Sequence, residues 1–332
     1  MADYKGIGYL RTKLVQKRTR VLMRYRYYEM KNAVRDFGLV TPPAFRAFSE
    51  TLGWCGKAVD SLADRLAFRE FRDDNFQLNG IYQMNNADVL FDSAILSAMV
   101  ASCSFIYISP DANGFPRLQV IDGGNATGVL DPITGLLQEG YAVLQRSDSG
   151  APVLEAYFTP GRTEYHQKGR GTIRTDKNDA PYPLLVPIIY RPDAARPFGH
   201  SRISRACMGI VQGALRTLKR SEISAEFYSF PQKYVLGLSS DADPLDSWRA
   251  TLSSMLQFTK DEDGDKPTVG QFTQQSMSPY TEQLRTFAAL FAGETGLTLD
   301  DLGFVTDNPS SAEAIKATVR EKIELFGSAN KA

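Results

Sequence analysis

The sequence predicts an α+β fold, with one block of strands between two mainly helical regions. Residues 104–191 break into short apolar runs separated by turn sequences such as DGGN and DPITG, a pattern typical of an antiparallel sheet or meander. Residues 203–228 contain no proline and carry a discontinuous apolar stripe, which indicates a long helix. Composition is ordinary for a globular protein, with 43% hydrophobic and 23% charged residues.

Three helices are expected before the strands. The first spans residues 20–37. The TPP at 41–43 is expected to separate this helix from the next one. A second is expected over 45–66, where apolar residues recur at i, i+3, i+4 and i+7. A third is expected over 84–101, after a pair of asparagines.

The strand block is expected to hold five strands, with VPIIYRPD closing it. Each run has strand length and is rich in β-branched and aromatic residues. The expected strands are 104–109, 117–121, 141–146, 153–158 and 163–167.

After the strands, the pattern predicts a helix, a small α/β insert and a second helix. The helices are expected over 203–228 and from 278 through 292, and the insert over 233–275. Residues 293–304 are expected to form a linker. The insert is expected to contain a strand at 234–238, a helix around 248–256 and a strand near 268–272.

Residues 306–324 have the features of a helix start. Ser310 and Glu313 have capping-box spacing, and Pro309 lies where a missing N–H costs little. An apolar stripe continues to Phe326, but the chain stops at Ala332. Either neighbouring subunits cover this stripe or the sequence is part of a longer protein, and we favour the second.

Cysteine usage and hydropathy indicate a reducing, aqueous environment. Cys55, Cys103 and Cys207 are far apart and odd in number, so we expect free buried thiols in the cytoplasm. No secretory signal and no membrane contact are expected. The uncharged stretch 93–110 is interrupted by serines, and a buried helix entering a strand is favoured there over a membrane span.

The net charge is zero, but charge is locally asymmetric. A basic arm at 11–35 could bind nucleic acid, with interleaved tyrosines stacking on bases. Pairing with a neighbouring subunit or solvent exposure is the alternative that we favour. The basic arm is represented by Lys17, Arg18, Arg20, Arg24 and Arg26, and a second basic patch by Arg216, Lys219 and Arg220.

An acidic block between residues 241 and 265 has the opposite sign. It would repel DNA, and it fits a surface past which DNA slides without sticking. Its acids are Asp241, Asp243, Asp246, Asp261, Glu262, Asp263 and Asp265.

No catalytic, cofactor or metal site is predicted, and the chain is not expected to be an enzyme. The sequence contains no phosphate-loop or dinucleotide-binding motif. His166 and His200 are the two histidines, and structural roles are favoured for both. The neighbouring Asp300 and Asp301 point apart on a regular element, so a helix-entry or loop role is favoured. The DEDGD loop lacks the glycine and glutamate of a calcium-binding EF-hand.

Several segments, taken in order, resemble the portal protein (head-to-tail connector) of tailed double-stranded DNA bacteriophages of the siphophage type. They are YYEMKNAVRDFGLVTPPAFRAFSETLGWCGKAVDSLADRL, DPITG followed by AYFTPGRTEYHQKGRG, VPIIYRPDAARPFGHSRIS, EISAEFYSFPQKYVLGL and NPSSAEAIKA. Each segment alone is a weak match to the family, whereas their order and spacing together are fairly specific for it.

The resemblance implies a ring, typically of twelve subunits, at one vertex of the capsid of the virion, assembled in the host cytoplasm. Its partners would be further copies of itself, DNA in the channel, the major capsid protein, the terminase large subunit and a head-completion adaptor. The implied parts are a basic arm or helix (1–40), a wing (41–200), a first stem helix (201–229), a clip (230–275), a second stem helix (276–297), a tunnel loop (298–310) and a tunnel helix (311–332) at the base of a crown that this chain lacks.

The resemblance also implies roles for two groups of residues. The acidic block would form the clip rim on which terminase and adaptor dock. Lys316 and Arg320 could face DNA phosphates or pair with Glu313 or Glu324, and both possibilities stay open. The residues assigned to the tunnel loop and DNA channel are Thr306, Asp307, Asn308, Ser310, Ser311, Lys316 and Arg320.

Two other functions are alternatives. One is a phage DNA-processing enzyme, such as a nuclease that uses Asp300 and Asp301 with Mg²⁺. The other is a smaller ring adaptor or capsid-associated binding module, which we would expect to be shorter and to lack the helix–insert–helix hairpin.

Overall fold

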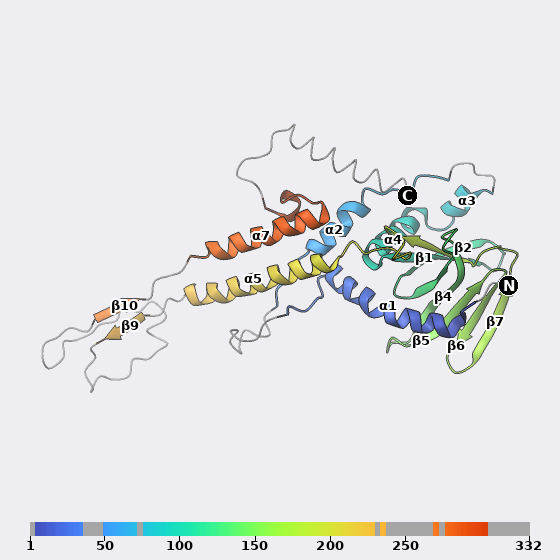
Figure 1. Ribbon diagram of the computed structural model, residues 1–332, viewed down its shortest axis with the longest axis horizontal. Helices are drawn as coiled ribbons and strands as arrows, with labels where there is room; N and C mark the ends of the chain where they lie inside the picture. Colours follow the sequence, from blue (N-terminus) through green and yellow to red (C-terminus); the bar gives the residue numbers. More distant parts are fainter. Residues whose placement is uncertain are drawn as a thin grey trace. The chain divides into compact units, whose positions relative to one another are not determined.

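A computed structural model describes residues 4–35, 49–71, 76–229, 233–236, 268–271 and 276–304 (Figure 1). The chain divides into two compact units. Unit 1 contains the residues up to 32, residues 51–211 and the residues from 291 onward, and unit 2 contains residues 33–50 and 212–290. The α+β class predicted from the sequence is confirmed.

The first helix, α1 (Gly6–Tyr28), starts and ends earlier than the predicted helix at 20–37. Met30 has a left-handed φ of 58°. The Lys31 N–H donates to the Arg26 carbonyl at 2.7 Å, and the Met30 N–H donates to the Tyr27 carbonyl at 3.4 Å. This pair of bonds is a Schellman motif, which terminates a helix at that point. The prediction missed it because the left-handed position is usually occupied by glycine.

Three further helices precede the sheets in unit 1. Helix α2 (Trp54–Ala63) is shorter than the predicted 45–66, because residues 49–53 are not helical. Helix α3 (Leu78–Gln83) was not predicted. Helix α4 (Ala87–Ala101) confirms the predicted helix at 84–101 and starts after Asn86, which has a left-handed φ of 57°.

The strand block forms two antiparallel sheets, where the sequence indicated one sheet or meander. In the first sheet, β1 (Cys103–Pro110) pairs with β2 (Pro116–Asp122) and with β8 (Leu185–Ile189). The second is a five-stranded meander in chain order. Its strands are β3 (Ala126–Leu130), β4 (Leu137–Arg146), β5 (Pro152–Thr159), β6 (Arg162–Gln167) and β7 (Gly171–Lys177).

The two sheets of unit 1 share one apolar core. The rings of Tyr107 on β1 and Phe158 on β5 lie 5.4 Å apart, edge to face. Gly140 on β4 allows a close approach, since a Cβ there would lie 2.9 Å from Leu185 Cδ2 of β8. The core cluster therefore draws side chains from both sheets.

Unit 2 contains most of α5 (Arg205–Ser229) and α7 (Ser278–Thr295), which lie side by side (Figure 1). Thr217 Oγ1 of α5 donates to Gln283 Oε1 of α7 at 2.8 Å, and Ser224 and Tyr280 hydroxyls lie 2.8 Å apart. Between the helices in sequence, β9 (Lys233–Leu236) pairs with β10 (Thr268–Gln271). Both predicted helices and both predicted strands of the insert are present. The predicted helix at 248–256 lies outside the described residues.

Cys55, Cys103 and Cys207 are free and buried, as predicted. Among the helices that the structure describes, none is both long and apolar enough to cross a membrane.

Candidate functional site

Helix α1 carries most of the predicted basic arm and docks on the five-stranded sheet. Leu10 and Leu14 are buried against Tyr141, Val143 and Tyr157. Because the apolar contacts occupy one stripe of the helix, its cationic residues lie to either side of that stripe.

The start of α1 is held by a buried carboxylate from the sheet. Glu139 of β4 is 1% exposed. Its carboxylate accepts hydrogen bonds from the backbone N–H groups of Lys5 at 2.9 Å and Gly6 at 3.0 Å, and from the Tyr157 hydroxyl at 2.7 Å. Glu139 thus satisfies N–H groups at the helix start that would otherwise lack partners.

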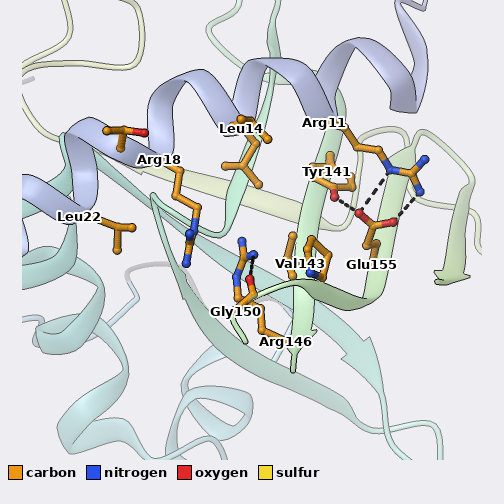
Figure 2. Close-up of a pocket in the computed structure, with 12 residues that line it drawn as sticks. Arg11, Leu14, Arg18, Leu22, Tyr141, Val143, Arg146, Gly150 and Glu155 are labelled. Carbon is orange, nitrogen blue, oxygen red and sulfur yellow. Dashed lines mark hydrogen bonds and ion pairs between the residues drawn. The ribbon is translucent and has the colours of Figure 1, made fainter. Parts of the chain in front are cut away.

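A second carboxylate, Glu155 of β5, fixes one flank of α1 (Figure 2). Arg11 makes a two-point ion pair with it, at 2.5 Å and 3.3 Å. The Tyr141 hydroxyl also donates to Glu155. Burial, and next the Glu155 carboxylate, raise the pKa of Tyr141, so the phenol stays protonated.

Arg11 and Glu155 border an open cleft of about 410 Å³ that Figure 2 shows. Arg18 of α1 and Arg146 of β4 also line it. Arg146 donates to Asn125 Oδ1 at 2.7 Å and to the Gly150 carbonyl at 2.9 Å. Burial, and next the neighbouring Arg18, lower the pKa of Arg146.

The remaining residues of the basic arm lie elsewhere on α1. Lys17, Arg20 and Arg24 line a different cleft, beside residues 196–199, whereas Arg26 is exposed and lines neither cleft. The basic arm is therefore two separate groups of cations on opposite flanks of one docked helix, a division that the run of charges in the sequence did not predict.

The second predicted basic patch lies on α5 in unit 2. Lys219 is 5% exposed, and Arg220 is exposed. Arg216 donates to the Arg35 carbonyl at 3.4 Å. Gln212 holds the segment at 33–35 against α5. Its side chain accepts a hydrogen bond from the Arg35 N–H at 2.8 Å and donates one to the Ala33 carbonyl at 2.9 Å.

The two histidines make local contacts. His200 Nε2 lies 2.5 Å from Asp193 Oδ2, and Arg196 Nη1 lies 3.3 Å from His200 Nδ1. His166 Nδ1 lies 3.2 Å from Thr172 Oγ1, its neighbour across the β6–β7 pair. These contacts are consistent with structural roles.

Asp300 and Asp301 belong to a short 3-10 helix, η2 (Asp300–Leu302). Asp301 Oδ2 accepts from the Thr298 N–H at 2.8 Å and from the Thr298 hydroxyl at 2.7 Å, and the Asp301 N–H donates back at 3.2 Å. This reciprocal pair of bonds has the spacing of a capping box and fits the predicted helix-entry or loop role. Within the described residues, no three His, Cys, Asp or Glu side chains group as metal ligands do.

Two sets of predicted site residues lie outside the described residues. One is the acidic set, from Asp241 to Asp265. The other is the tunnel set, from Thr306 to Arg320.

The chain is thus an α+β protein with a two-sheet unit and a helix–insert–helix unit. It is 26% identical to the portal protein of Mycobacterium phage D29, over 91% of this chain and 68% of that protein. It is also 26% identical to the portal protein of Mycobacterium phage L5, with the same coverage. These relatives confirm the resemblance to phage portal proteins. No family model matches the chain.

Solved structures with partial similarity come from gene transfer agent particles. A chain from the virion of the native gene transfer agent particle overlays with a TM-score of 0.46 at 14% identity. The overlay covers 89% of this chain and 79% of that one. A chain from the native particle's neck, computed with C12 symmetry, overlays with a TM-score of 0.43 at 16% identity, covering 90% and 81%. Both TM-scores are below 0.5.

Proposed function

We propose that this chain is the subunit of a portal ring at one vertex of a bacteriophage capsid, through which DNA enters during packaging and leaves during ejection. The observation that carries the proposal is its similarity to two phage portal proteins along 91% of its length. The role is structural, and the ring would comprise twelve copies, as the resemblance implies. The protein would be a component of the virion that assembles in the host cytoplasm.

The two units fit the parts of such a subunit. Residues 41–200, which include both sheets, would form the wing. Helices α5 and α7, within 201–229 and 276–297, would form the stem, and the β9–β10 pair would belong to the clip at 230–275. Direct hydrogen bonds between α5 and α7 support the stem assignment, because a hairpin that stays closed can pack as one unit against its neighbours.

The functional surfaces follow from this layout. The acids at 241–265 would line the clip rim, where terminase and adaptor proteins dock. The tunnel loop at 298–310 would project toward DNA, and the helix at 311–332 would anchor it. Lys316 and Arg320 would either face DNA phosphates or pair with Glu313 or Glu324. The major capsid protein would surround the wing.

Electron microscopy of the purified full chain and of virions tests the proposal. We expect rings with a central channel, and the same chain at the tail vertex. A monomer in solution would not contradict the proposal if virions carry the chain at that vertex. Virions that lack it there would overturn the proposal.

A further inference from the structure

The flank of α1 away from Glu155 borders a cleft of about 370 Å³ within unit 1. The end of α4 with Ser102, Thr127 of β3 and the segment at 196–199 form the rest of its walls. Cationic side chains dominate the polar lining. They are Lys13, Lys17, Arg20 and Arg24 of α1 and Arg196, and we call this site the basic cleft.

Helical geometry makes the four cations of α1 one row. At about 100° per residue, positions 13, 17, 20 and 24 fall within an arc of roughly 60°, and at 1.5 Å per residue they extend along about 16 Å of the helix. The buried Leu14 and Val21 lie beside this row. Arg18 lies roughly 140° from Lys13 by the same geometry and lines the other cleft instead.

No acid among the residues that the structure describes forms an ion pair with the row or lines the cleft beside it. The lining of the basic cleft contains no Asp or Glu. Among the residues that the structure describes, no ion pair involves Lys13, Lys17, Arg20 or Arg24. The positive charge of the cleft is therefore not neutralised by these contacts.

Neutral groups hold three of the cations in place. Lys13 Nζ donates to the Gly128 carbonyl at 2.6 Å, Lys17 Nζ lies 2.8 Å from Cys103 Sγ, and Arg24 Nη1 donates to the Ala101 carbonyl at 3.3 Å. Each ammonium or guanidinium has further N–H donors beyond the one used. The cations are thus pre-positioned with donors to spare.

Burial and mutual repulsion both disfavour the charged forms of Arg24 and Lys13. Burial, and next Arg20 and Arg196, lower the pKa of Arg24. Burial, and next Lys17, lower the pKa of Lys13. A bound anion would relieve both the burial cost and the repulsion.

We propose that the basic cleft binds phosphate groups of a nucleic-acid backbone. Arg20 is exposed, and its guanidinium can present paired donors to phosphate oxygens. Successive cations rise by about 4.5 to 6 Å along the helix, which corresponds to one to two nucleotides at roughly 3.4 Å each. A row of this length suits a strand of phosphates better than a single free ion.

This contact is separate in sequence from the tunnel residues and is not part of the proposed function. The inference rests on the cleft alone. The cleft can prove unable to bind DNA while the chain still forms portal rings. Conversely, rings can be absent while the cleft still binds DNA.

Fluorescence anisotropy of a labelled duplex of about 20 base pairs with the full chain tests the proposal. In the double variant Arg20→Glu/Arg196→Glu, we expect at least a tenfold loss of affinity. The slope of log K against the logarithm of salt concentration, measured over about 50 to 200 mM, should become less negative by about 2. Two phosphate contacts are lost, and each contributes about 0.9 to the slope. Arg20→Lys/Arg196→Lys should keep most of the affinity.

The matched control is Arg18→Glu/Arg26→Glu, which makes the same charge change on unit 1 outside the cleft. It should weaken binding less than about threefold, and matching circular dichroism and melting curves would show that both double variants fold. Equal losses in the two double variants, or no loss in either, would overturn the proposal.

Two competitors identify the ligand class. Inorganic phosphate at millimolar concentration should displace the duplex only weakly, and tight binding of phosphate with no binding of DNA would contradict a nucleic-acid ligand. Poly-glutamate tests for an acidic protein segment. If Arg20→Glu/Arg196→Glu abolishes poly-glutamate binding and leaves DNA binding intact, the proposal is wrong.

Discussion

Gly213 of α5 lies directly against the ring of Phe287 of α7. A Cβ at position 213 would lie 2.7 Å from two ring carbons, which is closer than packed carbon atoms approach. The glycine therefore sets how closely α5 and α7 pack in unit 2.

Substitution at Gly213 tests this packing. We expect Gly213→Ala to destabilise unit 2 by about 1 to 3 kcal/mol, because the methyl group must push the phenylalanine ring aside. The measurement is denaturant unfolding followed by circular dichroism.

Gly209→Ala is the matched control on the same helix. A Cβ at position 209 meets nothing within 4 Å, so the better helix propensity of alanine should stabilise the chain by up to about 1 kcal/mol. If both alanine variants shift stability in the same direction, the close contact does not control the packing.

The buried Glu139 should control how firmly α1 stays docked. In Glu139→Ala, the Lys5 and Gly6 N–H groups and the Tyr157 hydroxyl lose their acceptor, at a cost of about 1 to 3 kcal/mol. Hydrogen exchange should speed up throughout the first turns of α1 and much less in the sheet core. Glu222→Ala, at an exposed position of α5, should leave α1 exchange at the parent rate, and an equal effect from both variants would refute the anchoring role.

The sequence predicted helices α4, α5 and α7 well because their signals are local, whereas the predicted helix at 20–37 overlaps α1 only in part. The proline-free run at 203–228 locates α5, and the paired asparagines before residue 87 locate α4, both within three residues. Strands β3 and β7 were missed for a physical reason. Strand β3 is short and contains Gly128, and β7 is exposed at every position but one, so neither has the apolar alternation that marks a strand.

The candidate sites were harder to predict than the fold. The charge run at 11–35 showed that cations gather there, but the division into two flanks depends on how α1 docks. That docking depends on Glu139 and Glu155, which lie more than 130 residues away in sequence. Pairings of this separation leave no periodic signal in a single sequence.

Alkaline pH should destabilise unit 1 through Tyr25. Burial, and to a smaller extent Asp122, raise the pKa of Tyr25 from 10.0 to about 12. The fold therefore favours the neutral phenol. This stabilisation is fully present below pH 10 and is lost as the pH rises from 10 to 12, because the unfolded chain gives up the proton first.

The variant Tyr25→Phe isolates this contribution. It should flatten the fall in stability between pH 10 and 12, although it also removes the 2.9 Å hydrogen bond with Ser97 and lowers stability at neutral pH. Tyr4→Phe, at an exposed tyrosine, should reproduce the parent pH profile. An unchanged slope in Tyr25→Phe would show that another group governs alkaline unfolding.

Gln212 should hold the segment at 33–35 against α5 in unit 2. Its side chain makes one hydrogen bond to the Arg35 N–H and one to the Ala33 carbonyl, which imitates the pairing of a neighbouring strand. Gln212 is 6% exposed, so these bonds compete little with water. We expect Gln212→Ala to release the segment and to raise the rate of tryptic cleavage after Arg35 several-fold, as followed by mass spectrometry. The exposed Gln16→Ala serves as the control, and cleavage at the parent rate in Gln212→Ala would mean that other contacts hold residues 33–35 in place.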